Sequence, residues 1–182
     1  MEIELDYVKN EGDIQKFAGN YYYFSQNIKK SRRWTLLSVL IVSLIVAYLL
    51  NKIFEEGILS YLILVLILLI ACPIPALREH KKDTIKSINK RHTSRDLGVL
   101  GEYKALLTDD EVHITYLPND PRRQRNMTNK WDEFDFYNRD EDHFLIYINK
   151  SDLTYHIKAG EKAEDVDQFL NRKGLNKKQR KD

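Results

Sequence analysis

Hydrophobic residues are concentrated in two uninterrupted runs, at residues 34–50 and 58–77, and neither run contains a charged side chain. As α-helices they would be about 25 and 30 Å long, close to the thickness of a bilayer's hydrocarbon core. Both runs are apolar on every face, which disfavours a soluble helical hairpin with one buried side. The pattern therefore predicts a two-helix transmembrane hairpin, with the short loop 51–57 making the helices antiparallel neighbours.

Basic residues flank this predicted hairpin on both outer sides. The juxtamembrane set is Lys29, Lys30, Arg32, Arg33, Arg78, Lys81 and Lys82. The connecting loop holds Lys52 beside Glu55 and Glu56, so it is not basic. The positive-inside rule then predicts a multi-pass plasma-membrane protein with both termini in the cytoplasm. Segment 78–96 is expected to continue the second helix as a basic juxtamembrane helix, either simply solvated or in contact with anionic lipids.

The N-terminal segment, residues 1–33, predicts a short strand followed by a helix. Ile3, Leu5 and Tyr7 alternate with acidic residues, as in an amphipathic strand. Asp13 is the expected N-cap of the helix, and apolar residues recur three or four apart from position 14 to 28. Two placements are open for this helix. It lies in the headgroup layer, or it packs on the C-terminal domain, in which case the strand needs a sheet edge to join.

Residues 97–172 alternate over short segments, at 100–108, 112–117, 131–137 and 153–158, and 143–149 is near-continuously apolar, which predicts a central strand. We expect Phe134 and Phe136 to share one face, Leu153 to face inward, and His113 and His156 to face solvent. Residues 118–130 read as a long polar loop and 173–182 as a basic, frayed tail. After Gly160 comes a helix with one apolar stripe. Together these features predict an α+β protein, in which a small curved sheet or partial barrel is capped by a C-terminal helix.

This layout resembles a pleckstrin-homology-like (PH-like) domain, and the whole chain resembles the YcxB-like family of bacterial membrane proteins. The matching segments are Leu106–Val112, Lys130–Phe134 and Phe144–Tyr147, followed by the helix 165–170. The resemblance implies a bacterial plasma-membrane protein with a cytoplasmic PH-like domain. It implies no particular activity, since these motifs are packing patterns rather than a catalytic signature.

Composition and motifs argue against several function classes. The net charge of +2 gives no global field that would attract nucleic acid. Cys72 is the one cysteine, so neither an internal disulfide nor a cysteine zinc cluster is expected. The five histidines lack an HExxH spacing, and P-loop, GxGxxG and GxSxG motifs are missing from the sequence. Acidic clusters at 109–111 and 140–142 fit turns. We therefore expect a protein that is not an enzyme and has no cofactor or metal.

The predicted loop 118–130 offers the best contact surface. Its basic residues are Arg122, Arg123, Arg125 and Lys130. Guanidinium groups suit phosphate or carboxylate partners, so the loop is expected to contact anionic headgroups or an acidic protein, or else to be merely solvated. The sequence predicts a membrane-tethered binding or regulatory module. The alternative is an immunity or stress-protection protein that acts against a toxin or a membrane-active peptide. The protein partner and any homo-oligomer are left open.

Overall fold

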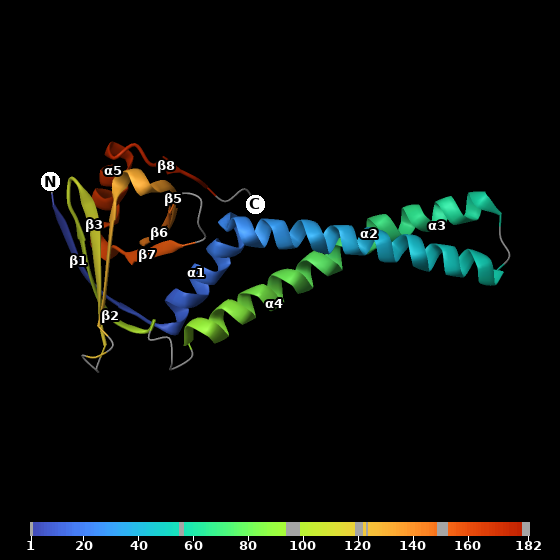
Figure 1. Ribbon diagram of the computed structural model, residues 1–182, viewed down its shortest axis with the longest axis horizontal. Coiled ribbons are helices and arrows are strands. Elements are labelled where there is room, and N and C mark those ends of the chain that lie inside the picture. Colours follow the sequence, from blue (N-terminus) through green and yellow to red (C-terminus); the bar gives the residue numbers. More distant parts are fainter. Residues whose placement is uncertain are drawn as a thin grey trace. The chain divides into compact units, whose positions relative to one another are not determined.

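The computed structural model describes residues 2–54, 57–93, 99–118, 122, 124–148 and 153–179, and its fold is α+β. The chain forms two compact units, coloured by sequence in Figure 1. The first comprises Met1–Tyr23 with Ser87–Asp182 and is called the β unit below. The second, Phe24–Lys86, is called the helical unit.

In the helical unit, two long apolar helices run side by side in opposite directions. They are α2 (Gln26–Phe54) and α3 (Ile58–Ala71), and α4 (Pro73–Thr93) follows α3. By length and composition, α2 and the combined span Ile58–Thr93 are each sufficient to cross a membrane. Ser43 and Ala47 are buried between neighbouring helices, where small side chains let two backbones approach closely.

The helix boundaries follow local chemistry. At the start of α2, the backbone N–H of Ile28 donates to the Ser25 hydroxyl at 3.3 Å, which is an N-cap contact. α3 ends at Ala71 and α4 begins at Pro73, because proline has no N–H to continue the ladder. α4 continues past residue 78 to Thr93, within the predicted basic segment 78–96, of which residues 94–96 lie outside the described residues.

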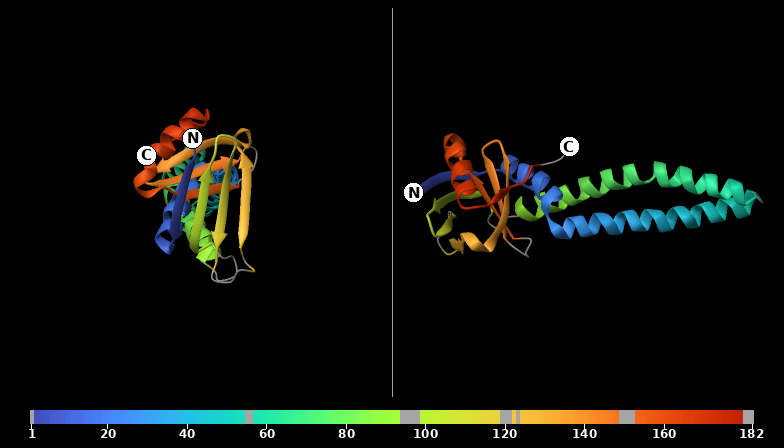
Figure 2. Two further views of the ribbon diagram at one scale, coloured as in Figure 1. Left: turned by 90° about the vertical axis from the view of Figure 1, so that its left-hand side faces the viewer. Right: turned by 90° about the horizontal axis from the view of Figure 1, so that it is seen from above.

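The first sheet of the β unit, sheet A, has four antiparallel strands in the order β1-β2-β3-β4, seen side by side in Figure 2. They are β1 (Ile3–Lys9), β2 (Gly101–Leu107), β3 (Glu111–Leu117) and β4 (Arg125–Lys130). The N-terminal strand finds its edge on β2, where Ile3 pairs with Leu107 and Lys9 with Gly101. Alternate residues of β1, β2 and β3 are buried, as their apolar periodicity predicts.

The second sheet, sheet B, has the order β7-β6-β5-β8. Its strands are β5 (Phe134–Asp140), β6 (His143–Ile148), β7 (Thr154–Lys158) and β8 (Asn176–Lys177), the last parallel to β5. As predicted, the near-continuous apolar segment β6 is central. Helix α5 (Ala163–Arg172) follows β7 and buries the predicted apolar stripe of Val166, Phe169 and Leu170 in the core shared with both sheets.

Two predicted irregular segments are wrong. Residues 125–130 form strand β4 rather than loop, because their backbone pairs with β3 while their polar side chains occupy the edge of the sheet. The tail is not frayed up to residue 179. Leu175 is buried, β8 pairs with β5, and the N–H of Lys178 donates to the Tyr137 carbonyl at 2.8 Å. One apolar anchor within a polar tail gives no periodicity from which to predict this pairing.

Three finer side-chain predictions are also wrong. A register shift separates Phe134 from Phe136, so they do not share one face: Phe134 joins the main core cluster, while Phe136, also buried, stacks on Tyr147 instead. Leu153 precedes β7 and is 67% exposed. Asp13 is not the N-cap of α1 (Glu11–Phe24), because Asn10 and Asp13 exchange backbone N–H to side-chain bonds as a capping box, with Asn10 as the cap.

Candidate functional site

The β unit contains a cavity of about 550 Å³, a size suited to a small molecule. Its walls come from sheet A, from β6 and β7, from α1 and from the last turn of α4. The apolar and aromatic lining includes Ile14, Phe17, Tyr103, Ile114, Tyr116 and Tyr155. β4 presents Arg125, Met127 and Asn129 to this side, and of these three only Met127 is apolar. Because those side chains do not fill the space as a hydrophobic strand would, the two sheets leave a hollow between them.

Lys9 is the most unusual group in this lining. It continues the inward positions of β1 and is only 7% exposed. Its Nζ lies 4.1 Å from the centre of the Tyr103 ring and 5.7 Å from that of Tyr7. Among the described residues, no carboxylate lies within ion-pair distance of this nitrogen. Burial lowers the pKa of Lys9 to about 7, even though the charge of Asp13 raises it.

His156 is the second buried polar group of the cavity. Contrary to the predicted solvent position, it is 5% exposed, and its ring stacks on Phe17. Nε2 lies 2.9 Å from Nδ1 of His143, whereas Nδ1 of His156 has no hydrogen-bond partner among the described residues. Burial holds the pKa of His156 well below its usual value, and the charges of Lys9 and His143 lower it further. The prediction of an exposed His156 from alternating side chains is wrong because both faces of β7 are buried.

A polar network behind His156 fixes α1 against sheet B. Nε2 of His143 lies 3.5 Å from Oδ1 of Asp13 and 3.4 Å from Oδ1 of Asp142. The Lys158 ammonium contacts the same Asp13 oxygen at 3.1 Å. Burial lowers the pKa of His143, although Asp142 and Asp13 oppose the shift. These contacts confirm that the N-terminal helix packs on the C-terminal domain, and they make one wall of the cavity rigid.

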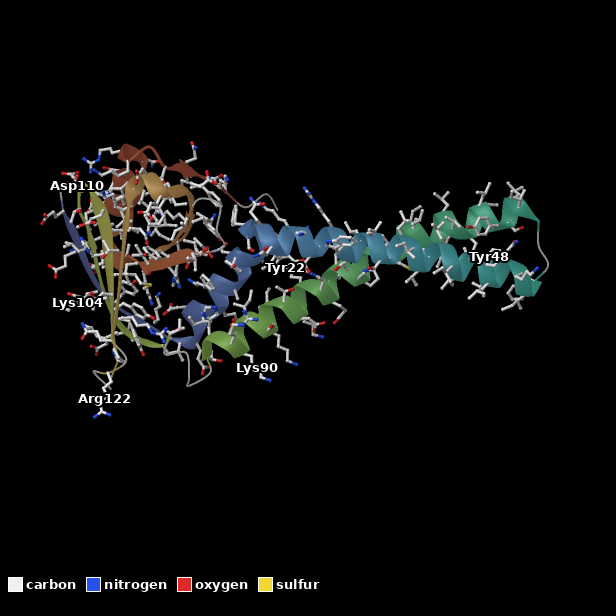
Figure 3. All side chains as sticks on the ribbon, in the orientation of Figure 1. Tyr22, Tyr48, Lys90, Lys104, Asp110 and Arg122 are labelled. Carbon is white, nitrogen blue, oxygen red and sulfur yellow. The ribbon has the colours of Figure 1, made fainter. Side chains whose placement is uncertain are left out.

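The predicted contact residues do not form one cluster. Arg125 pairs with Tyr116 and faces the cavity, whereas Lys130 lies five residues along β4, on the opposite face and about 17 Å away. Arg122 is exposed and points away from the domain, as Figure 3 shows. Arg123 lies outside the described residues. The role of these residues in contacting a partner stays a prediction.

The juxtamembrane basic residues do come together within the helical unit. They occupy the start of α2 and the middle of α4, and a hydrogen bond of 2.9 Å between Ser31 Oγ and His80 Nε2 joins these two segments. Lys82 also forms an exposed ion pair with Glu79 at 3.7 Å. The hairpin therefore presents its basic residues at one end, the end opposite the turn between α2 and α3.

The acidic clusters have structural partners. Asp109 accepts a hydrogen bond from Lys173, which lowers the pKa of Asp109 to about 2, and Glu141 pairs with Lys16. His113 contacts Thr128 and Glu111 on the outer face of sheet A, and it does not approach His156. Within the described part of the chain, no group of three or more histidine, cysteine or acidic side chains is placed to hold a metal ion.

Chemically, the cavity combines an aromatic lining with cationic and hydrogen-bonding groups. Its charged lining residues are Lys9, Arg125 and Glu133, and Glu133 is exposed and accepts a hydrogen bond from Asn129. This arrangement is suited to holding a ligand with an apolar body and a polar head. Comparison of the chain with protein-family models, with curated proteins and with solved structures finds no match.

Proposed function

We propose that this protein is a non-enzymatic binding module anchored in the bacterial plasma membrane. α2 and the α3–α4 span cross the bilayer, both termini lie in the cytoplasm, and the β unit is a PH-like domain of the YcxB-like type. The domain binds a small ligand in its cavity and acts as a regulatory element at the membrane surface. The observation that carries this proposal is the cavity, whose wall holds the buried Lys9 ammonium with no ion-pair partner among the described residues.

The exposure of the long helices supports membrane insertion. In the most apolar stretch of the second span no residue is buried within the protein, and Ile58 at its start is 78% exposed. A core helix of a soluble protein would bury one face of such a segment. A lipid environment covers all faces at once, and the basic residues at one end of the hairpin suit an anionic cytoplasmic leaflet.

The cavity's polar groups favour binding over catalysis. A nucleophilic mechanism needs a nucleophile within hydrogen-bond reach of a general base. Lys9 instead lies over aromatic rings, and the described hydrogen bond of the His156 ring goes to His143, behind the lining. Fixed aromatic walls and a preformed cation are the means by which binding sites orient a small ligand.

Native mass spectrometry of the full-length protein in lipid nanodiscs tests this proposal. Wild-type protein extracted from its own membranes should carry a bound small molecule. Met127→Trp fills the cavity from the inner face of β4, while Asn126→Trp places the same side chain on the outer face as a matched control. We expect the adduct in the wild type and in Asn126→Trp, and its loss in Met127→Trp. An adduct that survives in Met127→Trp, or that is missing from all three proteins, would contradict the proposal.

A further inference from the structure

We infer that the ligand of this cavity is an amphipathic acid, whose anionic head pairs with Lys9 and whose apolar body lies along the aromatic wall. The inference rests on the proposed binding function and adds the chemical class of the ligand. It is carried by the position of one buried cation, by an unsatisfied polar atom beside it, and by the apolar lining.

The first supporting observation is the buried ammonium of Lys9. Burying an ammonium without a counter-ion is costly, and proteins almost always pair such a group. The nearest candidate partner, Asp13, is already bonded to Lys158 and faces His143. The rings of Tyr103 and Tyr7 stabilise the Lys9 ammonium in part, since the negative face of an aromatic ring attracts a cation. An anion entering the cavity would complete the pairing that the described residues leave unmade.

The second observation is Nδ1 of His156. This atom is buried, belongs to a cavity-lining side chain, and has no partner among the described residues. A buried polar atom without a hydrogen bond is destabilising, because it has lost its water partners and gained none in exchange. A hydroxyl or a bridging water at a ligand's polar head would satisfy it. His156 therefore marks the Lys9 end of the cavity as the place for a polar head rather than for apolar atoms.

The rest of the lining accepts the apolar body. Ile14, Phe17, Ile114 and Met127 present hydrocarbon, and Tyr155 adds an aromatic face. A second cation, Arg125, lies at the end of β4 that pairs with Tyr116. An amine ligand would meet repulsion from both Lys9 and Arg125, while the lining carboxylate Glu133 is exposed and already accepts a hydrogen bond from Asn129. An uncharged alcohol would leave Lys9 without an anionic partner. For ligands with the same hydrocarbon chain, the lining therefore favours an acidic head group over an amine or an alcohol.

Binding of an anion should be linked to protonation of Lys9. The charged or titratable groups around it are Asp13 on α1, His92 on α4, Tyr7 on β1, Tyr103 on β2, Tyr116 on β3, Arg125 on β4, Glu133 between β4 and β5, and Tyr155 and His156 on β7. The pKa of Lys9 near 7 means that most of the ligand-free protein carries the ammonium at pH 6 and little of it does at pH 8.5. Affinity for an anion should therefore fall roughly 30-fold between these pH values.

The test uses three water-soluble probes with the same eight-carbon chain, namely octanoate, octanol and octylamine. Binding to full-length protein in nanodiscs is measured by calorimetry at pH 6 and pH 8.5, and the signal of empty nanodiscs is subtracted. Lys9→Met removes the charge and keeps the length of the side chain. Lys104→Met is the matched control, since Lys104 is exposed on the same sheet and pairs with Asp6.

We expect octanoate to bind the wild type and Lys104→Met at least tenfold more tightly than octanol or octylamine, and to lose at least tenfold in Lys9→Met. Three results would overturn the inference: octanol binding as tightly as octanoate, octanoate binding unchanged in Lys9→Met, or no saturable octanoate binding. The broader binding function would then still be supported by an adduct that Met127→Trp removes, so the two failures are distinguishable.

Discussion

Replacing Lys9 by methionine should stabilise the ligand-free protein, and the gain should depend on pH. The pKa of Lys9 is about 7 in the folded protein against 10.5 for the ordinary side chain. A displacement of this size corresponds to a burial cost on the order of 5 kcal/mol while the group is charged. The cost is present in full below pH 7, since the folded protein then carries the buried ammonium.

The direction of this pH dependence follows from the number of protons that the folded and unfolded states bind. Between pH 7 and 10.5 the unfolded chain holds the Lys9 proton and the folded protein does not, so wild-type stability rises with pH across that window. Lys9→Met lacks this titration. The stability advantage of Lys9→Met over the wild type should therefore shrink by about 3 kcal/mol between pH 6 and pH 9. Lost contacts with the rings of Tyr7 and Tyr103 reduce the absolute gain, but they do not alter its dependence on pH.

Denaturant unfolding of the full-length protein in nanodiscs measures this difference. Trp131 is buried against Phe134 and Phe169, so its fluorescence reports the unfolding of the β unit. Lys104→Met again serves as the control, and its difference from the wild type should be nearly constant with pH. If the advantage of Lys9→Met were constant from pH 6 to pH 9, Lys9 would carry an ordinary pKa, and the buried-cation reasoning would be refuted.

Further substitutions test the supports of the cavity, each by denaturant unfolding of the β unit. Asp13→Asn should lower the free energy of unfolding by about 1–3 kcal/mol, because Lys158 and His143 lose their shared carboxylate; an unchanged midpoint would contradict the network. Leu175→Ala should cost about 2–5 kcal/mol through lost burial, and a change below 0.5 kcal/mol would show the tail to be undocked. Tyr137→Phe should cost about 1–2 kcal/mol because it removes the 2.7 Å hydrogen bond to Asp167, whereas a stabilised variant would argue against that bond.

Strong periodicity made much of the fold predictable. The spacing of apolar residues was sufficient to predict several elements, namely β2, β3, β6, α5 and the pair of long apolar helices. β4 was missed because an edge strand needs no apolar side chains, and its pairing comes from backbone hydrogen bonds with β3. β8 was missed because the docking of two residues depends on Leu175 alone. The pairing of β4 and the docking of β8 both depend on contacts with distant segments, which a short window of sequence does not contain.

The candidate site was harder to predict than the fold. The alternation of Ile3, Leu5 and Tyr7 extends to position 9, so an inward Lys9 was the one signal available in the sequence. His156 gave none, since covering both faces of β7 removes the link between alternation and exposure. A cavity is also a property of packing between distant segments. The polar inner face of β4 creates it only after β4 has paired with β3.

The central claim is that the two apolar spans cross a bilayer and hold the β unit on its cytoplasmic side. In a Cys72→Ala background, which removes the one native cysteine, Gly57→Cys marks the turn of the hairpin and Asp135→Cys marks an exposed position of β5. A membrane-impermeant maleimide should label Gly57→Cys in intact spheroplasts and Asp135→Cys only after lysis. Labelling of Asp135→Cys before lysis, or release of the protein from membranes by an alkaline salt wash, would contradict the account.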